Sequence, residues 1–176
     1  MIFDGVPGGQ ADGTPELAAA ILSARQSKPV WCSVTDDCCS AGYWCAAQTE
    51  KIYCNATGKT GCIGVYAVVY DLSKNAEQQG IRVQVVSTGG VKGLGVPGTP
   101  LDPAFIAEIQ HNVDVINTFF VDAVAAGRRM DKSRCADLAD GRDYFAADAL
   151  ALGLIDAVGS FDDALGDFEQ FLDVTH

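Results

Sequence analysis

The chain has 176 residues, enough for one domain with a buried core, because a chain near this size hides roughly 70% of its unfolded surface. Hydrophobic residues make up 48% of it and charged residues 20%, as in ordinary globular proteins. The formal charge of −11 argues against nucleic acid as a partner, and the sequence shows neither an apolar membrane span nor a secretory signal, so we expect a cytoplasmic protein.

Helices and short strands alternate along the first half of the chain. Thr14 and Pro15 cap a helix over 16–25, and small residues form a short helix over 40–48. Runs of apolar and β-branched residues predict strands over 29–34, 51–54 and 63–70.

The second half is predicted to be mostly helical. It holds a helix over 73–79, a strand over 81–86 and a loop with five glycines over 89–100. The longest helix starts at Asp102-Pro103 and ends near Ala126, before Gly127. Shorter helices are predicted over 131–139, 145–152 and 161–172. Alternating elements indicate an α/β domain with a mostly parallel sheet flanked by helices, and we expect residues 1–176 to form a single domain.

Seven cysteines are unusually many for such a chain. Their spacings are irregular and do not form the paired hooks of a zinc site. Most stand in apolar runs, so we expect small, buried core residues, and neither a metal nor a cofactor.

Ser40 is the candidate nucleophile, because a turn of small residues presents it at the start of a helix. A hydroxyl becomes nucleophilic only when a base takes its proton, and histidine is the usual base. The chain has two histidines, His111 on the face of the long helix and the terminal His176, so a Ser-His-Asp triad is hard to build.

Lysine is the other candidate base, provided that burial keeps its amine neutral. Lys92 stands among glycines, with no acidic residue between Arg82 and Asp102. Composition alone favours a solvated loop lysine over a buried base. Upstream, the Gly8-Gly9 turn is either a plain strand-to-helix turn or a source of N–H donors for an oxyanion.

Five stretches occur together, in order, in a way that is more specific than any single motif. They are residues 4–9 (Asp-Gly-Val-Pro-Gly-Gly), 40–44 (Ser-Ala-Gly-Tyr-Trp), 60–65 (Thr-Gly-Cys-Ile-Gly-Val), 80–92 (Gly-Ile-Arg-Val, then Gly-Val-Lys) and 139–156 (Ala-Asp-Gly-Arg-Asp-Tyr-Phe, then Ala-Leu-Ala-Leu-Gly-Leu-Ile-Asp). In this the chain resembles the signal peptide peptidase A-like serine peptidases, peptidase family S49. That family includes phage minor capsid and head-maturation proteases and has the Clp-protease/crotonase-like superfold.

The resemblance implies a Ser-Lys dyad in which Ser40 attacks a peptide carbonyl and Lys92 is the base. The oxyanion would lie between the N–H groups of Gly8 or Gly9 and that of Ala41. The resemblance also implies a homo-oligomer in which Lys92 can reach the Ser40 of a neighbouring subunit, and substrates such as signal peptide remnants or phage capsid and scaffold proteins. We expect small or apolar residues at the cleavage site.

The chain departs from the family pattern at several positions. Val6 and Cys62 replace serines, and Cys39 precedes Ser40, where a thiol could be mistaken for the nucleophile. Only six residues precede Pro7, so we expect a domain without the first N-terminal strands of the family. Two other hypotheses stay open, a catalytically weak or inactive assembly subunit of the same fold and a crotonase-like protein that binds acyl thioesters.

Overall fold

The structure is a computed structural model that describes residues 2–4 and 6–175. The chain divides into two compact units. Unit 1 comprises Met1–Gly64 and Asn117–His176, and unit 2 comprises Val65–Ile116. Helix α4 (Pro103–Gly127) has residues in both units. None of the described helices combines the length and the apolar character that crossing a membrane requires.

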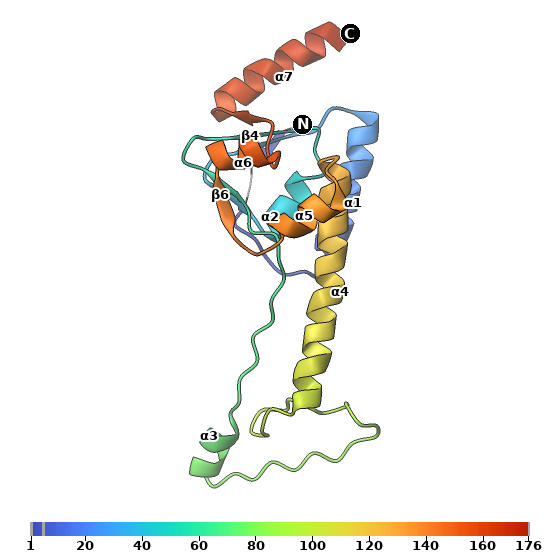
Figure 1. Ribbon diagram of the computed structural model, residues 1–176, viewed down its shortest axis with the longest axis vertical. Helices are drawn as coiled ribbons and strands as arrows, with labels where there is room; N and C mark the ends of the chain where they lie inside the picture. Colours follow the sequence, from blue (N-terminus) through green and yellow to red (C-terminus); the bar gives the residue numbers. More distant parts are fainter. Residues whose placement is uncertain (1, 5, 176) are drawn as a thin grey trace. The chain divides into compact units, whose positions relative to one another are not determined.

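Unit 1 contains two small sheets (Figure 1). The first sheet has the strand order β1-β2-β4-β7, and all its strands are parallel. Its strands are β1 (Ile2–Asp4), β2 (Trp31–Val34), β4 (Lys51–Cys54) and β7 (Ala157–Val158). The second has the order β3-β5-β6, from β3 (Asp37–Cys39), β5 (Lys59–Gly61) and β6 (Asp143–Phe145). Strands β3 and β5 are parallel, and β6 is antiparallel to β5. The predicted α/β class with a mostly parallel sheet is confirmed.

Five further helices belong to unit 1. They are α1 (Thr14–Ser27), α2 (Ala41–Ala46), α5 (Lys132–Leu138), α6 (Ala146–Leu152) and α7 (Phe161–Thr175). Helix α7 packs against β2 and β4. The ring of Trp31 meets that of Phe168 edge to face at 5.0 Å and stacks on that of Tyr53 at 5.9 Å. Such aromatic pairs add to the stability that burial of apolar surface provides.

Unit 2 holds the short helix α3 (Ser73–Gln78) and the glycine-rich loop. The loop approaches side chains closely where it has glycine: a Cβ on Gly93 would lie 2.7 Å from Val85, and one on Gly95 would lie 2.3 Å from Phe105. No residue of 65–116 is buried, and the structure describes all of them.

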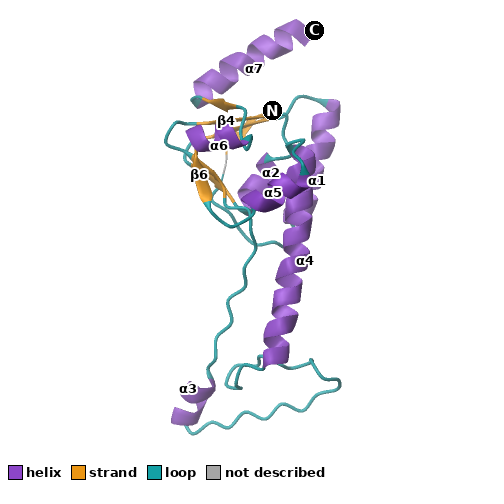
Figure 2. Cartoon of the chain, in the orientation of Figure 1, coloured by secondary structure: helices purple, strands orange, loops and turns teal. Residues whose placement is uncertain are grey.

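Two predicted strands, over 63–70 and 81–86, were wrong. Both segments are drawn as loop on either side of α3 in Figure 2, and neither joins a sheet within the described residues. A strand is stable only when its N–H and C=O groups pair with those of a neighbouring strand. Alternating apolar residues predict the conformation of a strand but cannot supply that neighbour.

Candidate active site

Ser40 occupies a strained backbone position between β3 and α2. Its φ is 51° and its ψ is −125°, a region that residues with a side chain rarely adopt. Its N–H donates to the carbonyl oxygen of Gly61 at 2.9 Å, which fixes the junction to the end of β5. A conformation of this kind costs about 1–3 kcal/mol and persists where the surrounding packing imposes it, most often at functional sites.

The Ser40 hydroxyl is not engaged by the local structure. Serine commonly caps a helix through its side chain, but Ser40 makes no such bond to α2 although it stands at the capping position. The hydroxyl has no hydrogen-bond partner among the residues the structure describes, and the residue is half-buried. The local fold therefore presents the Ser40 hydroxyl without occupying it.

The turn of residues 6–9 lies directly against Ser40. The N–H of Cys39 donates to the carbonyl oxygen of Val6 at 3.0 Å, which ties the turn to β3. Gly8 has a φ of +142°, and a Cβ there would lie 3.1 Å from the Cβ of Ser40. A Cβ on Gly42 would lie 2.2 Å from the Val6 carbonyl oxygen. Both glycines are needed for this close approach.

The same contact brings unused N–H donors beside the hydroxyl. A Cβ on Gly9 would lie 4.0 Å from the Cβ of Ala41, so the turn and the start of α2 abut. Within the described part of the chain, the N–H groups of Gly8, Gly9 and Ala41 donate to no backbone acceptor. The structure thus brings four of the predicted site residues together, and their roles stay a prediction.

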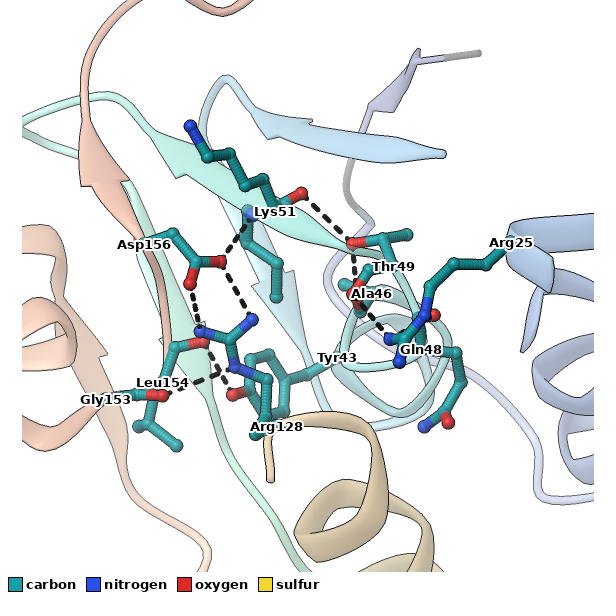
Figure 3. Close-up of polar contacts among 11 residues, drawn as sticks. Arg25, Tyr43, Ala46, Gln48, Thr49, Lys51, Arg128, Gly153, Leu154 and Asp156 are labelled. Carbon is teal, nitrogen blue, oxygen red and sulfur yellow. Dashed lines mark hydrogen bonds and ion pairs between the residues drawn. The ribbon is translucent and has the colours of Figure 1, made fainter. Parts of the chain in front are cut away.

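A network of polar contacts, buried at Tyr43 and exposed at Asp156, holds α2 in place (Figure 3). The hydroxyl of Tyr43 donates to the Leu154 carbonyl oxygen at 2.7 Å. Arg128 donates to both carboxylate oxygens of Asp156, at 2.8 and 2.9 Å, and to the Gly153 carbonyl oxygen at 3.3 Å. The segment that accepts from Tyr43 is therefore itself anchored by an arginine–carboxylate pair.

The Arg128–Asp156 pair is largely shielded from water on the arginine side. The Arg128 side chain is 6% exposed, and the Asp156 side chain is 31% exposed. Burial has the largest single influence and lowers the pKa of Arg128, but the bond to Asp156 and the charges of Tyr43 and Asp156 together outweigh it, and the pKa is raised. Asp156 also accepts from the N–H of Ile52 at 2.8 Å, which links the pair to β4.

Further contacts fix the C-terminal end of α2. Arg25 on α1 donates to the carbonyl oxygens of Gln48 and Thr49, at 3.1 and 3.0 Å. On another side, the rings of Trp44 and Phe120 stack with their centroids 4.6 Å apart. The sequence did not reveal Arg25, Arg128 and Asp156 as supports of the site, because no local pattern relates residues so far apart to their partners.

Cys39 is unsuited to be the nucleophile. It is buried, and its thiol lies 3.8 Å from the Lys59 carbonyl oxygen. Burial, together with the neighbouring Cys62, raises the pKa of Cys39 to about 12, so its thiolate is scarce at neutral pH.

The cysteines are free thiols, and six of the seven are buried, with Cys62 half-buried. The prediction that they are mostly small core residues is confirmed. No group of three or more His, Cys, Asp or Glu side chains in the described part of the chain could hold a metal ion.

The predicted base lies in the other unit. Lys92 is exposed in the glycine-rich loop of unit 2, whereas Ser40 belongs to unit 1, and its pairing with Ser40 stays a prediction. His111 is exposed on α4 in unit 2, and His176 lies outside the described residues.

An apolar cavity of about 480 Å³ adjoins the Gly8-Gly9 turn. Helices α1 and α2 form its walls, and Ala41 and Gly42, which follow Ser40, line it. All its lining residues belong to unit 1. Its volume lies within the range usual for sites that bind small ligands.

Proteins of similar sequence are proteases by name. The chain is 26% identical over 170 residues to Protease 4 of Haemophilus influenzae, covering 94% of this chain and 27% of that one. It is 29% identical to a putative signal peptide peptidase SppA of Enterococcus faecium (93% and 48% covered) and 28% identical to capsid assembly protease C of phage lambda (95% and 38%). The chain thus spans between about a quarter and a half of the length of these relatives.

Solved structures show the same fold. A membrane-bound stomatin-specific protease superposes with a TM-score of 0.52 at 13% identity, covering 94% of this chain and 67% of that one. A peptidase of Plasmodium falciparum superposes with a TM-score of 0.51 at 12% identity, covering 86% and 69%. The chain thus shares the α/β fold of these two peptidases, and the predicted α/β class is confirmed. The profile of peptidase family S49 matches residues 23–175, and the chain belongs to that family.

Proposed function

We propose that this chain is a serine endopeptidase in which Ser40 is the nucleophile and Lys92 is the general base. The observation that carries the proposal is the strained backbone of Ser40, which presents an unoccupied hydroxyl next to the unused N–H groups of the Gly8-Gly9 turn. Membership of a peptidase family supports the same reaction class.

In the proposed reaction, the Ser40 hydroxyl oxygen attacks the carbonyl carbon of a peptide bond while the neutral Lys92 amine accepts the hydroxyl proton. The N–H groups of Ala41 and of Gly8 or Gly9 bind the oxyanion that forms. The intermediate collapses, and Lys92 passes its proton to the leaving amine. Water then attacks the acyl-enzyme, Lys92 takes a proton from it, and Ser40 regains that proton as the carboxylic acid leaves.

The amine of Lys92 must be removed from solvent to serve as a base, because desolvation favours its neutral form. An exposed lysine stays charged near neutral pH, and a charged amine accepts no proton. Lys92 is exposed in the single chain, so the proposal requires a second surface to cover it. We propose that a second copy of the chain supplies that surface, and that the Ser40 and Lys92 of one site come from neighbouring subunits.

Mixing two inactive variants tests this arrangement. Ser40→Ala keeps the lysine and Lys92→Ala keeps the serine, so a mixed oligomer regains intact sites if the dyad is shared between subunits. Recovery of cleavage after mixing supports sharing. A monomeric protein, or an oligomer whose mixture stays as inactive as each variant alone, contradicts it.

The substrates we propose are proteins or peptides, such as signal peptide remnants or phage capsid and scaffold proteins. The names of two relatives, a putative signal peptide peptidase and a capsid assembly protease, support these two kinds. Digestion of casein and of a peptide library, followed by mass spectrometry, tests the activity. We expect cleavage by the wild type and by the control Ser23→Ala, with none by Ser40→Ala.

A second candidate is a structural subunit of the same fold without turnover. It is favoured by the exposure of Lys92, which leaves the proposed base incomplete in the single chain. A defined oligomer in size-exclusion chromatography that cleaves none of these substrates would support this alternative and contradict the peptidase proposal.

A further inference from the structure

Two cysteines flank the contact between Ser40 and β5. Cys39 precedes Ser40 at the end of β3, and Cys62 follows Gly61 at the end of β5. The two strands are parallel, and Cys39 pairs with Gly61 in their register. Because the N–H of Ser40 donates to the Gly61 carbonyl oxygen, the cysteines stand on either side of the bond that fixes Ser40.

The backbone brings these two cysteines within reach of a disulfide. Neighbouring strands lie about 4.8 Å apart and successive Cα atoms about 3.8 Å apart, so the Cα atoms of Cys39 and Cys62 are separated by roughly 6 Å. Disulfides span about 4.4–6.8 Å between Cα atoms. The φ values of Gly61 and Cys62, 99° and 49°, end the alternation of side chains along β5. The Cys39 thiol already points to β5, 3.8 Å from the Lys59 carbonyl oxygen.

The ionisation of Cys39 also reflects a nearby Cys62. Burial and then Cys62 raise the pKa of Cys39 to about 12, and Cys62 acts more strongly than the neighbouring carboxylates. Such an influence falls with distance, so Cys62 is close. After burial, the influence of Cys38 raises the pKa of Cys45 and of Cys54, which places Cys38 among the thiols of the core.

From this arrangement we propose that Cys39 and Cys62 form a reversible disulfide that switches the Ser40 site off. The disulfide is independent of the proposed function, whereas the loss of cleavage rests on it. Cys39 is 7% exposed and Cys62 is half-buried, so a small two-electron oxidant such as hydrogen peroxide reaches Cys62 first.

The reaction proceeds in two steps. The Cys62 thiolate attacks one oxygen of the peroxide, the O–O bond breaks, and hydroxide leaves and takes up the proton that the thiol released. The Cys39 sulfur then attacks the sulfur of the Cys62 sulfenic acid, and the S–O bond breaks with loss of water. The two thiols lose two electrons, which reduce the peroxide to water. A dithiol reductant reverses the bond by exchange.

The bond would displace the groups around Ser40. A disulfide holds its two Cβ atoms about 3.8 Å apart, which pulls Cys39 toward the end of β5. The N–H of Cys39 also donates to the Val6 carbonyl oxygen, so the turn that carries the proposed oxyanion donors moves with it. Because a shift of about 1 Å at a catalytic site can cost about 100-fold, we expect cleavage to fall about tenfold or more.

Peptide mapping after oxidation tests the disulfide without any need for turnover. The protein is treated with hydrogen peroxide, its remaining thiols are alkylated, and it is digested with trypsin without reduction. Trypsin releases residues 26–51, which contain Cys39, and residues 60–74, in which Cys62 is the one cysteine. We expect mass spectrometry to find these peptides cross-linked in the wild type and in the control Cys38→Ala, but not in Cys39→Ala or Cys62→Ser.

Cleavage assays on the same samples test the switch. We expect the wild type and Cys38→Ala to lose cleavage on oxidation and to recover it with dithiothreitol, whereas Cys39→Ala keeps its rate. No cross-link between these two peptides, or one that joins two chains on a non-reducing gel, would overturn the disulfide. An unchanged rate in the cross-linked wild type, or an equal loss in Cys39→Ala, would overturn the switch. A protein that forms the cross-link but cleaves nothing when reduced supports the disulfide and contradicts the peptidase proposal.

Discussion

Units 1 and 2 hold the two halves of the proposed dyad, and they differ in how completely a single chain builds them. In unit 1, the helix that follows Ser40 is buried and is fastened by Tyr43, Trp44 and the Arg128–Asp156 pair. In unit 2, no residue is buried, and Lys92 stands exposed in a glycine-rich loop. The chain alone thus fixes the surroundings of the proposed nucleophile, whereas the proposed base stays exposed to solvent.

Because of this difference, we expect substitutions near Ser40 and substitutions at Lys92 to have different consequences. A strained residue such as Ser40 needs rigid surroundings, and unit 1 supplies them. An exposed lysine needs only to be covered, which assembly can do without rearranging the core. We therefore expect changes in unit 1 to affect stability and activity together, and changes at Lys92 to affect activity alone.

Hydrogen exchange should show the largest contrast. Amides within and just after α2, residues 44–49, are hydrogen-bonded in the buried part of unit 1, so their exchange requires substantial unfolding. Amides over 82–90 should exchange faster by about 10³-fold or more, because nothing buries them in the single chain. Mass spectrometry at a concentration where the protein is monomeric measures both. Similar exchange rates for the two sets of amides would contradict the difference between units 1 and 2.

Removing Asp156 should destabilise unit 1 strongly. Asp156→Leu leaves the Arg128 guanidinium buried without its counter-charge, and we expect a loss of about 3 kcal/mol in the free energy of unfolding. Urea denaturation measures it. Asp122→Ala breaks an exposed pair with Lys132 and should change stability by about 0.5 kcal/mol or less. Equal losses of stability in the two variants would contradict a stabilising role of the Arg128–Asp156 pair in unit 1.

Gly42→Ala should separate the turn from Ser40. The new Cβ would collide with the Val6 carbonyl oxygen, so residues 6–9 must move and the N–H donors shift with them. We expect cleavage to fall about 100-fold. The control is Gly166→Ala on α7, where nothing lies within 4 Å and alanine favours the helix. Full activity in Gly42→Ala would exclude the turn from the site.

Cys39→Ala should have the smallest effect. Because the thiol is buried with a pKa of about 12, it supplies almost no thiolate at neutral pH. We expect kcat/KM within about twofold of the wild type and a stability loss of about 1 kcal/mol. If Cys39 were the nucleophile, the variant would be inactive, and the wild-type rate would rise steeply toward pH 11.

The sequence predicted best those helices and strands that are specified by patterns of neighbouring residues. Helices α1, α3 and α4 and strand β4 lie where capping residues, periodicity and apolar runs placed them. Strands β3, β5 and β7 have two or three residues, too few for a period to be recognised. The strands predicted over 63–70 and 81–86 failed because pairing is not a local property.

The candidate site was predictable to the extent that residues adjacent in sequence create it. Ser40 and Ala41 follow from a turn of small residues, and the ordered family motifs pointed to Gly8, Gly9 and Lys92. The Arg128–Asp156 pair was missed because it spans 28 residues, and most charged residues are solvated. The cavity was missed because its walls, α1 and α2, meet only in the fold.

Labelling with a fluorophosphonate probe tests the Ser40–Lys92 dyad most directly. Mass spectrometry of the wild type, Lys92→Ala and the control Lys74→Ala, each at a concentration where it is assembled, locates the label and gives its rate. We expect a label on Ser40 in the wild type and in Lys74→Ala, and its loss in Lys92→Ala. Labelling of Ser40 at an unchanged rate in Lys92→Ala would contradict the lysine base, and no label on Ser40 in any of the three would contradict the nucleophile.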